Sequence, residues 1–314
     1  MLLMVMEGFA LLFNGGGYSA PAIDKDSIDR NKVTTALENL KTLADDTTAF
    51  YCKYHVICHS GGRIEGCDYT NSLEAWKESY AKGNRLMDAD MSFTRDGHLV
   101  LKHEWNDNLE QTNVPMKDSR LITDPNGSKR YLLSKDTIVD YKTFKSTSIF
   151  HRFTPMTVDD MLDFMDSHPD IYVATDFKGS DVLKGYQSLV VAAKRKKMVL
   201  ELDRIIVSLY DFKLFQKVKQ IYPFKNIVMR QYIYEPHNYS ELAKFCVDNG
   251  IHVVNISKCY VNDPGVKLLM SEGIHVFVAV VDDLGEYKRL RAEGFSGCVS
   301  NIIRENELKK LRLN

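Results

Sequence analysis

The chain has 314 residues, of which 44% are hydrophobic, and its formal net charge at pH 7 is −1. This length suits one large α/β domain or two smaller ones. The near-neutral charge, with no basic run longer than residues 194–197, gives no indication of a nucleic-acid partner. The six cysteines include no Cys-x-x-Cys pair, which argues against a zinc site and favours reduced thiols in a reducing compartment.

The first residues of the chain are unusually apolar. Residues 1–13 carry only one charge, on Glu7, and a flexible Asn-Gly-Gly-Gly joint follows at 14–17. The segment is too short to cross a bilayer and lacks the basic start of a signal peptide. Peripheral membrane contact through this segment and a purely structural role both stay open. Because the cysteines favour a reducing compartment, we expect a cytoplasmic protein. The apolar segment gives the alternative, a membrane-associated or extracytoplasmic location.

Residues 1–26 are predicted to be an N-terminal segment and linker, and residues 27–314 a single domain. The spacing of Val33, Leu37, Leu40 and Leu43 predicts a helical extension over 27–46. Residues 104–152 are rich in Asp, Asn, Lys and Ser and are predicted to be an irregular insertion before the third core strand. Helices are predicted at 71–82, from Thr157 to 165, and at 181–196, 212–221, 238–248, 264–271, 284–293 and from 304 onward.

These helices alternate with short apolar strands. Eight core strands are predicted, near residues 56, 88, 173, 206, 228, 253, 278 and 298. Apolar strands that alternate with helices indicate a parallel sheet covered by helices. Eight such units in about 260 residues predict a (β/α)8 TIM barrel, with a doubly wound open sheet as the alternative. No Gly-x-Gly-x-x-Gly follows a strand, so a dinucleotide-binding fold has no support.

The stretch from Asp88 to His103 concentrates polar residues at strand ends. Side chains alternate across a strand, so Asp88 and Asp90 share one face. Two carboxylates so close repel each other unless a cation lies between them or solvent reaches both. A turn at 94–97 then leads into a second strand, over 99–103, that ends in His103.

In a barrel, the carboxyl ends of the strands form one rim, where the chemistry takes place. On this rim we expect two histidines, a lysine and three carboxylates. They are His59, His103, Lys178, Asp88, Asp90 and Asp176. Three hard oxygen donors suit Mg²⁺ or Ca²⁺. Two histidines suit acid–base catalysis, and a cation with a lysine would stabilise developing negative charge on a phosphoryl group.

These residues carry a family resemblance that extends from Val56 to Asn301. The chain resembles the glycerophosphodiester phosphodiesterases, within the superfamily of the phosphatidylinositol-specific phospholipases C. The matching segments are 58–62 (CHSGG), 69–75 (YTNSLEA), 88–90 (DAD), 94–97 (TRDG), 103–104 (HE), 155–160 (PMTVDD), 176–178 (DFK) and 297–301 (GCVSN). The ordered set is far more specific than any one segment.

The resemblance implies a role for each residue. His59 and His103 would be the acid–base pair, and Lys178 would contact phosphate. One divalent cation, Mg²⁺ or Ca²⁺, would be held by three carboxylates, those of Asp88, Asp90 and Asp176. The implied substrate is a small-molecule or lipid-derived phosphodiester. The implied reaction has two steps, in which a glycerol hydroxyl of the substrate attacks phosphorus and water then opens the cyclic phosphate.

Several positions depart from the family pattern. Ser60 stands where the family has an arginine, and Arg63 is the candidate that we expect to reach the substrate in its place. Asp replaces Glu at positions 88 and 176, and Asn301 replaces a closing Asp. These departures leave two alternatives open. One is a phospholipase C- or D-like enzyme that releases a cyclic phosphate from a lipid headgroup, and the other is a catalytically inactive barrel that binds phosphorylated ligands.

Overall fold

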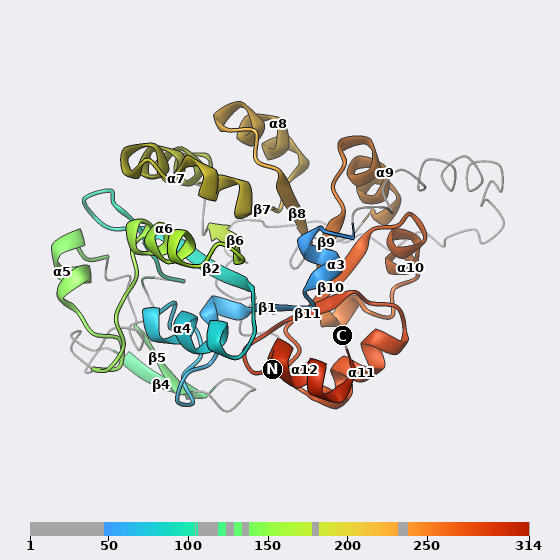
Figure 1. The fold of residues 1–314 in the computed structure, drawn as a ribbon, viewed down its shortest axis with the longest axis horizontal. Helices are drawn as coiled ribbons and strands as arrows, with labels where there is room; N and C mark the ends of the chain where they lie inside the picture. The colour runs from blue at the N-terminus through green and yellow to red at the C-terminus, as the bar shows by residue number, and fades with distance from the viewer. Residues whose placement is uncertain are drawn as a thin grey trace, which may run out of the picture. The chain divides into compact units, whose positions relative to one another are not determined.

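Eight parallel strands close into a barrel, with helices around it (Figure 1). The computed structural model describes residues 47–103, 105, 119–123, 129–133, 138–177, 182–231 and 238–313. The barrel strands are β1 (Val56–Cys58), β2 (Leu86–Phe93), β6 (Tyr172–Phe177), β7 (Ile205–Leu209), β8 (Asn226–Gln231), β9 (Val253–Ser257), β10 (His275–Ala279) and β11 (Gly297–Ser300). Strand β1 pairs with both β2 and β11, which closes the sheet. The predicted TIM barrel is confirmed, and closure excludes the open-sheet alternative.

The helices that follow the strands begin and end close to the predicted residues. They are α4 (Leu73–Ala81), α6 (Val158–Ser167), α7 (Val182–Lys196), α8 (Phe212–Ile221), α9 (Tyr239–Asn249), α10 (Pro264–Ser271), α11 (Leu284–Ala292) and α12 (Glu305–Leu311). Thr157 caps α6 through a capping box with Asp160. Gly250 ends α9 at a φ of 65°, a left-handed conformation that glycine adopts without steric cost.

Two apolar layers hold the barrel together. The larger one lies between the strands and the outer helices and includes Trp76, Met161 and Leu189. The smaller one fills the inside of the barrel with one residue from each strand. Phe50 and Tyr51 of the short helix α3 (Phe50–Lys53) belong to this inner layer. Since both layers are buried and apolar, they leave the carboxyl ends of the strands to carry the polar groups.

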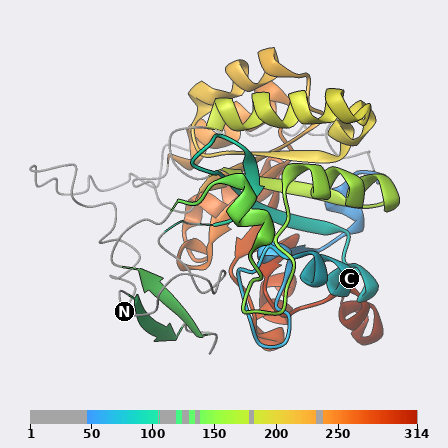
Figure 2. The same ribbon diagram turned by 90° about the vertical axis from the view of Figure 1, so that its left-hand side faces the viewer.

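The predicted insertion contains regular structure that composition did not reveal. Strands β4 (Ser119–Thr123) and β5 (Lys129–Leu133) form an antiparallel sheet of their own, seen as two green arrows in Figure 2. Helix α5 (Tyr141–Ser146) follows, capped by Asp140. The strand predicted over 99–103 is shorter, as β3 (Leu99–Leu101), and it pairs antiparallel with β2. Three 3-10 segments complete the described structure: η2 (His59–Gly61), η4 (Val199–Arg204) and η5 (Lys258–Tyr260).

Residues 1–46 lie outside the described residues. They include the apolar segment 1–13, the predicted boundary at 26 and the whole of the predicted helix over 27–46. Those predictions, and the location of the protein, stay predictions. Among the helices that the structure does describe, none combines the length and the hydropathy needed to cross a membrane.

Candidate active site

The chain turns sharply where β1 ends, and this turn presents His59. Ser60 has φ 49° and ψ 34°, and Gly61 and Gly62 also have positive φ values. A Cβ on Gly61 would lie 2.4 Å from Cδ1 of the buried Trp76 ring, so no larger residue fits there. The backbone therefore leaves the strand in a tight, glycine-dependent turn with a half-buried His59 at its start.

The imidazole of His59 is oriented by the end of the last strand. Its Nδ1 lies 3.0 Å from Oδ1 of Asn301. Nδ2 of Asn301 donates to Oδ2 of Asp282 at 2.8 Å, and the Asn301 backbone N–H donates to Oδ1 of Asp282 at 2.7 Å. Because Asp282 accepts from the Asn301 amide nitrogen, the amide oxygen must face His59 and accept from Nδ1–H. In this tautomer Nε2 of His59 carries a lone pair and can accept a proton.

The ring of Tyr69 contacts both of the predicted catalytic histidines. Its centroid is 4.8 Å from that of His59 and 5.7 Å from that of His103, and both contacts are edge-to-face. Tyr69 adopts a φ of 60°, which is uncommon for a bulky side chain. The structure therefore brings His59 and His103 into contact with one and the same aromatic ring.

A buried arginine joins two of the predicted carboxylates. Nη2 of Arg230, on β8, lies 2.5 Å from Oδ1 of Asp88, and Nη1 lies 3.4 Å from Oδ2 of Asp176. Nε of the same guanidinium donates to Oγ of Ser208 at 2.8 Å. Tyr210 donates its hydroxyl to Oδ1 of Asp176 at 2.9 Å. Asp88 is fully buried, and burial raises the pKa of its carboxyl while the Arg230 guanidinium opposes that rise.

Asp90, the third predicted carboxylate, is held by the turn after β1 and by the start of α4. Its Oδ2 accepts from the hydroxyl of Ser60 and, at 3.0 Å, from Nδ2 of Asn71. The Asp90 backbone N–H donates to Oδ1 of Asn71 at 3.1 Å. Ser60 therefore anchors Asp90.

The structure describes one of the two predicted substrate-binding cations, Arg63, but not the other, Lys178. Lys178 lies outside the described residues, so its contact with phosphate stays a prediction. Arg63 donates from Nε and Nη2 to the two oxygens of Asp68, at 2.7 and 2.6 Å. The side chain of Asp68 is fully buried. A role for Arg63 in substrate binding therefore stays a prediction, and Asp68 would compete for its guanidinium.

The three carboxylates predicted to hold Mg²⁺ or Ca²⁺ do not fit a divalent ion as they are arranged. Oxygens of Asp88 and Asp176 face Arg230, and an oxygen of Asp90 accepts two hydrogen bonds. In the described part of the chain, no group of three or more His, Cys, Asp or Glu side chains is placed to hold a metal. The metal role of Asp88, Asp90 and Asp176 stays a prediction, and no reaction step below passes through a metal.

A buried amide next to Arg230 also faces the inside of the barrel. Asn255 on β9 is the register partner of Arg230, so their side chains share a face. Asn255 is fully buried, yet neither Oδ1 nor Nδ2 has a hydrogen-bond partner among the described residues. An unsatisfied buried amide costs about 1–3 kcal/mol of stability.

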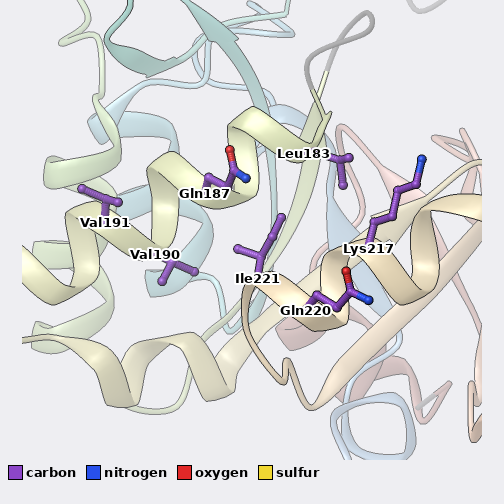
Figure 3. A pocket seen from close by; sticks show the side chains of 7 residues that line it. All are labelled: Leu183, Gln187, Val190, Val191, Lys217, Gln220 and Ile221. Carbon is purple, nitrogen blue, oxygen red and sulfur yellow. The ribbon is translucent and has the colours of Figure 1, made fainter.

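One surface groove lies away from these residues. It has a volume of about 490 Å³ and is formed by α7 and α8, with Val190, Val191 and Ile221 among its lining residues (Figure 3). Lys217 is its one charged lining residue. Because this groove offers no pair of acid–base groups, we place the candidate active site at the strand ends.

Comparisons with known proteins identify the family to which this barrel belongs. A model of the glycerophosphoryl diester phosphodiesterase family matches residues 60–304. The chain belongs to this family and is thus a phosphoric diester hydrolase of the glycerophosphodiester phosphodiesterase type. No curated protein sequence matches it.

Solved structures share the fold at low sequence identity. A glycerophosphodiester phosphodiesterase from Parabacteroides distasonis is 18% identical with a TM-score of 0.58, over 82% of this chain and 96% of that one. The enzyme from Thermotoga maritima is 16% identical with a TM-score of 0.55, over 83% and 99%. An Oleispira antarctica phosphodiesterase, solved with the product sn-glycerol-3-phosphate, is 12% identical with a TM-score of 0.60, over 83% and 97%.

Sequence reasoning did not identify Tyr69, Tyr210, Arg230 or Asp282 as site residues. For Arg230 a signal was present, because it is the one charged residue in the strand Asn226–Gln231. A charge in a buried strand needs a buried partner. The others gave no comparable signal, since their roles depend on contacts between residues far apart in sequence.

Proposed function

We propose that the protein hydrolyses glycerophosphodiesters by acid–base catalysis with His59 and His103. The observation that carries this proposal is the array of His59, Tyr69 and His103, in which the Asn301 amide sets the tautomer of His59. Two imidazoles in one site can accept and donate protons in the same step. The product bound to the Oleispira antarctica phosphodiesterase, sn-glycerol-3-phosphate, supports a glycerol-containing substrate.

In the first step, Nε2 of His59 takes the proton of the glycerol hydroxyl next to the phosphodiester. The hydroxyl oxygen forms a bond to phosphorus while the bond from phosphorus to the leaving alcohol breaks. The protonated His103 gives its proton to that leaving oxygen. The products of this step are the alcohol, a cyclic glycerol phosphate, a protonated His59 and a neutral His103.

The second step reverses the two roles. His103 takes a proton from water, whose oxygen bonds to phosphorus and opens the ring. His59 returns its proton to the glycerol oxygen that leaves phosphorus. Glycerol phosphate is released, and both histidines regain their starting protonation states. The sequence-based expectation that this reaction depends on a divalent ion is separate from these proton transfers.

The test follows both products by phosphorus NMR with glycerophosphocholine as the substrate. We expect linear glycerol phosphate as the final product and a loss of about 10²–10⁴-fold in turnover for both His59→Ala and His103→Ala. His98→Ala is the matched control, because His98 is exposed, with 55% of its side-chain surface accessible. Wild-type turnover in His59→Ala would refute the acid–base assignment. A cyclic phosphate that persists as the final product would favour the phospholipase-like alternative.

A further inference from the structure

The feature that the proposed function does not use is the position of Arg230. Its side chain is 2% exposed and points into the barrel, where it reaches two strands, β2 and β6, that do not pair with β8 in the sheet. The guanidinium contacts Asp88 on β2, Asp176 on β6 and Ser208 on β7. Strand β8 therefore sends a cation across the barrel to the two carboxylates on β2 and β6.

The charges around Arg230 explain why a cation is needed there. Asp88 and Asp90 are both 0% exposed and Asp176 is 5% exposed, so solvent screens none of them well. Buried carboxylates that share a site repel each other and need a compensating positive charge. A guanidinium keeps its proton at any physiological pH, and its fork of N–H groups matches carboxylate oxygens.

We propose that Arg230 is the resident cation of this centre, in the place that the family resemblance gives to a divalent ion. Its charge holds the Asp88 and Asp176 carboxylates and offsets the negative charge that develops on the phosphoryl group. A divalent ion on Oδ1 of Asp88 would have to displace the guanidinium, and one on another carboxylate oxygen nearby would be repelled by it. Hydrolysis therefore proceeds without an added divalent ion.

Arg230 is a positioning residue in this proposal, since the structure does not place it against a substrate. Oδ2 of Asp88 is buried and has no hydrogen-bond partner among the described residues. It is thus an oxygen that Mg²⁺ or Ca²⁺ would take as a ligand if the centre bound either ion. Direct titration of the wild-type chain therefore decides the question without reference to activity.

The experiment uses the full chain after chelation and titrates it with MgCl₂ and with CaCl₂ by calorimetry, alongside thermal melting. For the wild type we expect no saturable binding and no change in melting temperature. Arg230→Met removes the charge but keeps much of the side-chain volume. We expect this variant to melt at a lower temperature, to gain saturable binding of a divalent ion, and to recover part of its melting temperature when the ion is present.

Two further variants make the result specific. Arg195→Met removes the cation from a surface pair with Asp159, in which the arginine side chain is 59% exposed, and it should gain no binding. Arg230→Lys keeps the charge and loses the fork, so it should also stay without divalent binding. If Arg230→Met does not fold, the wild type and Arg230→Lys still decide the outcome. Saturable wild-type binding that Asp88→Asn abolishes would overturn the proposal.

This inference rests on the proposed function, because it assumes the same hydrolysis reaction. An activity assay distinguishes a failure of the Arg230 role from a failure of the proposed function. Wild-type turnover should persist in EDTA, while Arg230→Met should lose about 10²–10³-fold and regain part of that loss with Mg²⁺ or Ca²⁺. Turnover that appears only with a divalent ion would overturn the role of Arg230 and leave the proposed function intact. No turnover under any condition would refute the proposed function, and calorimetry would still test the cation.

Discussion

The inside of the barrel changes from apolar to polar within two residues along seven of its eight strands. The lower layer is entirely apolar and contains Ile57, Leu86, Ala174, Ile206, Val228, Val253, Phe277 and Val299. Two residues further along the chain, at the strand ends or just past them, the upper layer contains His59, Asp88, Asp176, Ser208, Arg230, Asn255, Ala279 and Asn301. Seven of these eight residues are polar, so stability and chemistry occupy adjacent layers of one barrel.

The two layers differ in what they contribute to folding. The lower layer gains free energy by removing apolar surface from water. The upper layer has to bury carboxylates, an arginine and an amide, and a buried ion pair often contributes little or nothing net. Asn255 illustrates the cost, because its amide has no hydrogen-bond partner in the described residues. We conclude that the lower layer stabilises the frame in which the upper layer keeps its polar groups.

The largest effect on stability is expected from truncation in the lower layer. Phe277 is fully buried and lies on β10, and Phe277→Ala should lower the free energy of unfolding by about 3–5 kcal/mol. The matched variant in the upper layer is Asn255→Ala, which removes an amide without a described partner and should change stability by about 1 kcal/mol or less. Denaturant unfolding of both variants gives the comparison. Equal losses would mean that the two layers do not differ as we describe.

The lower layer was more predictable from the sequence than the upper one. Apolar strands such as Ile205–Leu209 can be predicted from their composition, and their alternation with helices then predicts a barrel. The polar residues after β1 and on β2 could also be predicted as site residues, because their spacing matches a family pattern. The pairing of Arg230 with Asp88 was not visible, since 142 positions separate the two residues in sequence. Such a contact depends on the closure of the barrel.

The next effect concerns the orientation of His59 by Asn301. Asn301→Ala removes the acceptor for Nδ1–H, which lies 3.0 Å away, and should lower turnover by about 10–100-fold while leaving the fold intact. Asn301→Asp keeps an acceptor but adds negative charge, which stabilises the imidazolium. We therefore expect the acid limb of its pH–rate profile to move to higher pH.

A merely structural role for Asn301 would not move that profile. Asn249→Ala serves as the control, because Asn249 donates from Nδ2 to the carbonyl of Phe245 within helix α9, away from the strand ends. It should keep both the turnover and the pH profile of the wild type. Unchanged turnover in Asn301→Ala would show that the tautomer of His59 is set by another group.

A pH-dependent effect is expected below the lower layer, at His55, which comes just before β1. Burial, helped by the charges of Arg291 and His275, lowers the pKa of His55 to about 4 from its usual 6.5. The unfolded chain therefore binds a proton at His55 at a higher pH than the folded chain does. Stability should fall as the pH drops from about 6.5 to about 4, and this contribution should level off below that range.

We expect His55 to account for about 1–2 kcal/mol of that loss, because partial exposure to solvent weakens the effect of burial. His55→Gln should remove this part of the pH dependence, and His98→Gln, at an exposed position, should not. Denaturant unfolding at several pH values between 4 and 7 measures the difference between wild type and variant, in which the titration of other groups cancels. Parallel stability curves for His55→Gln and the wild type would show that His55 is protonated equally in the folded and unfolded chains.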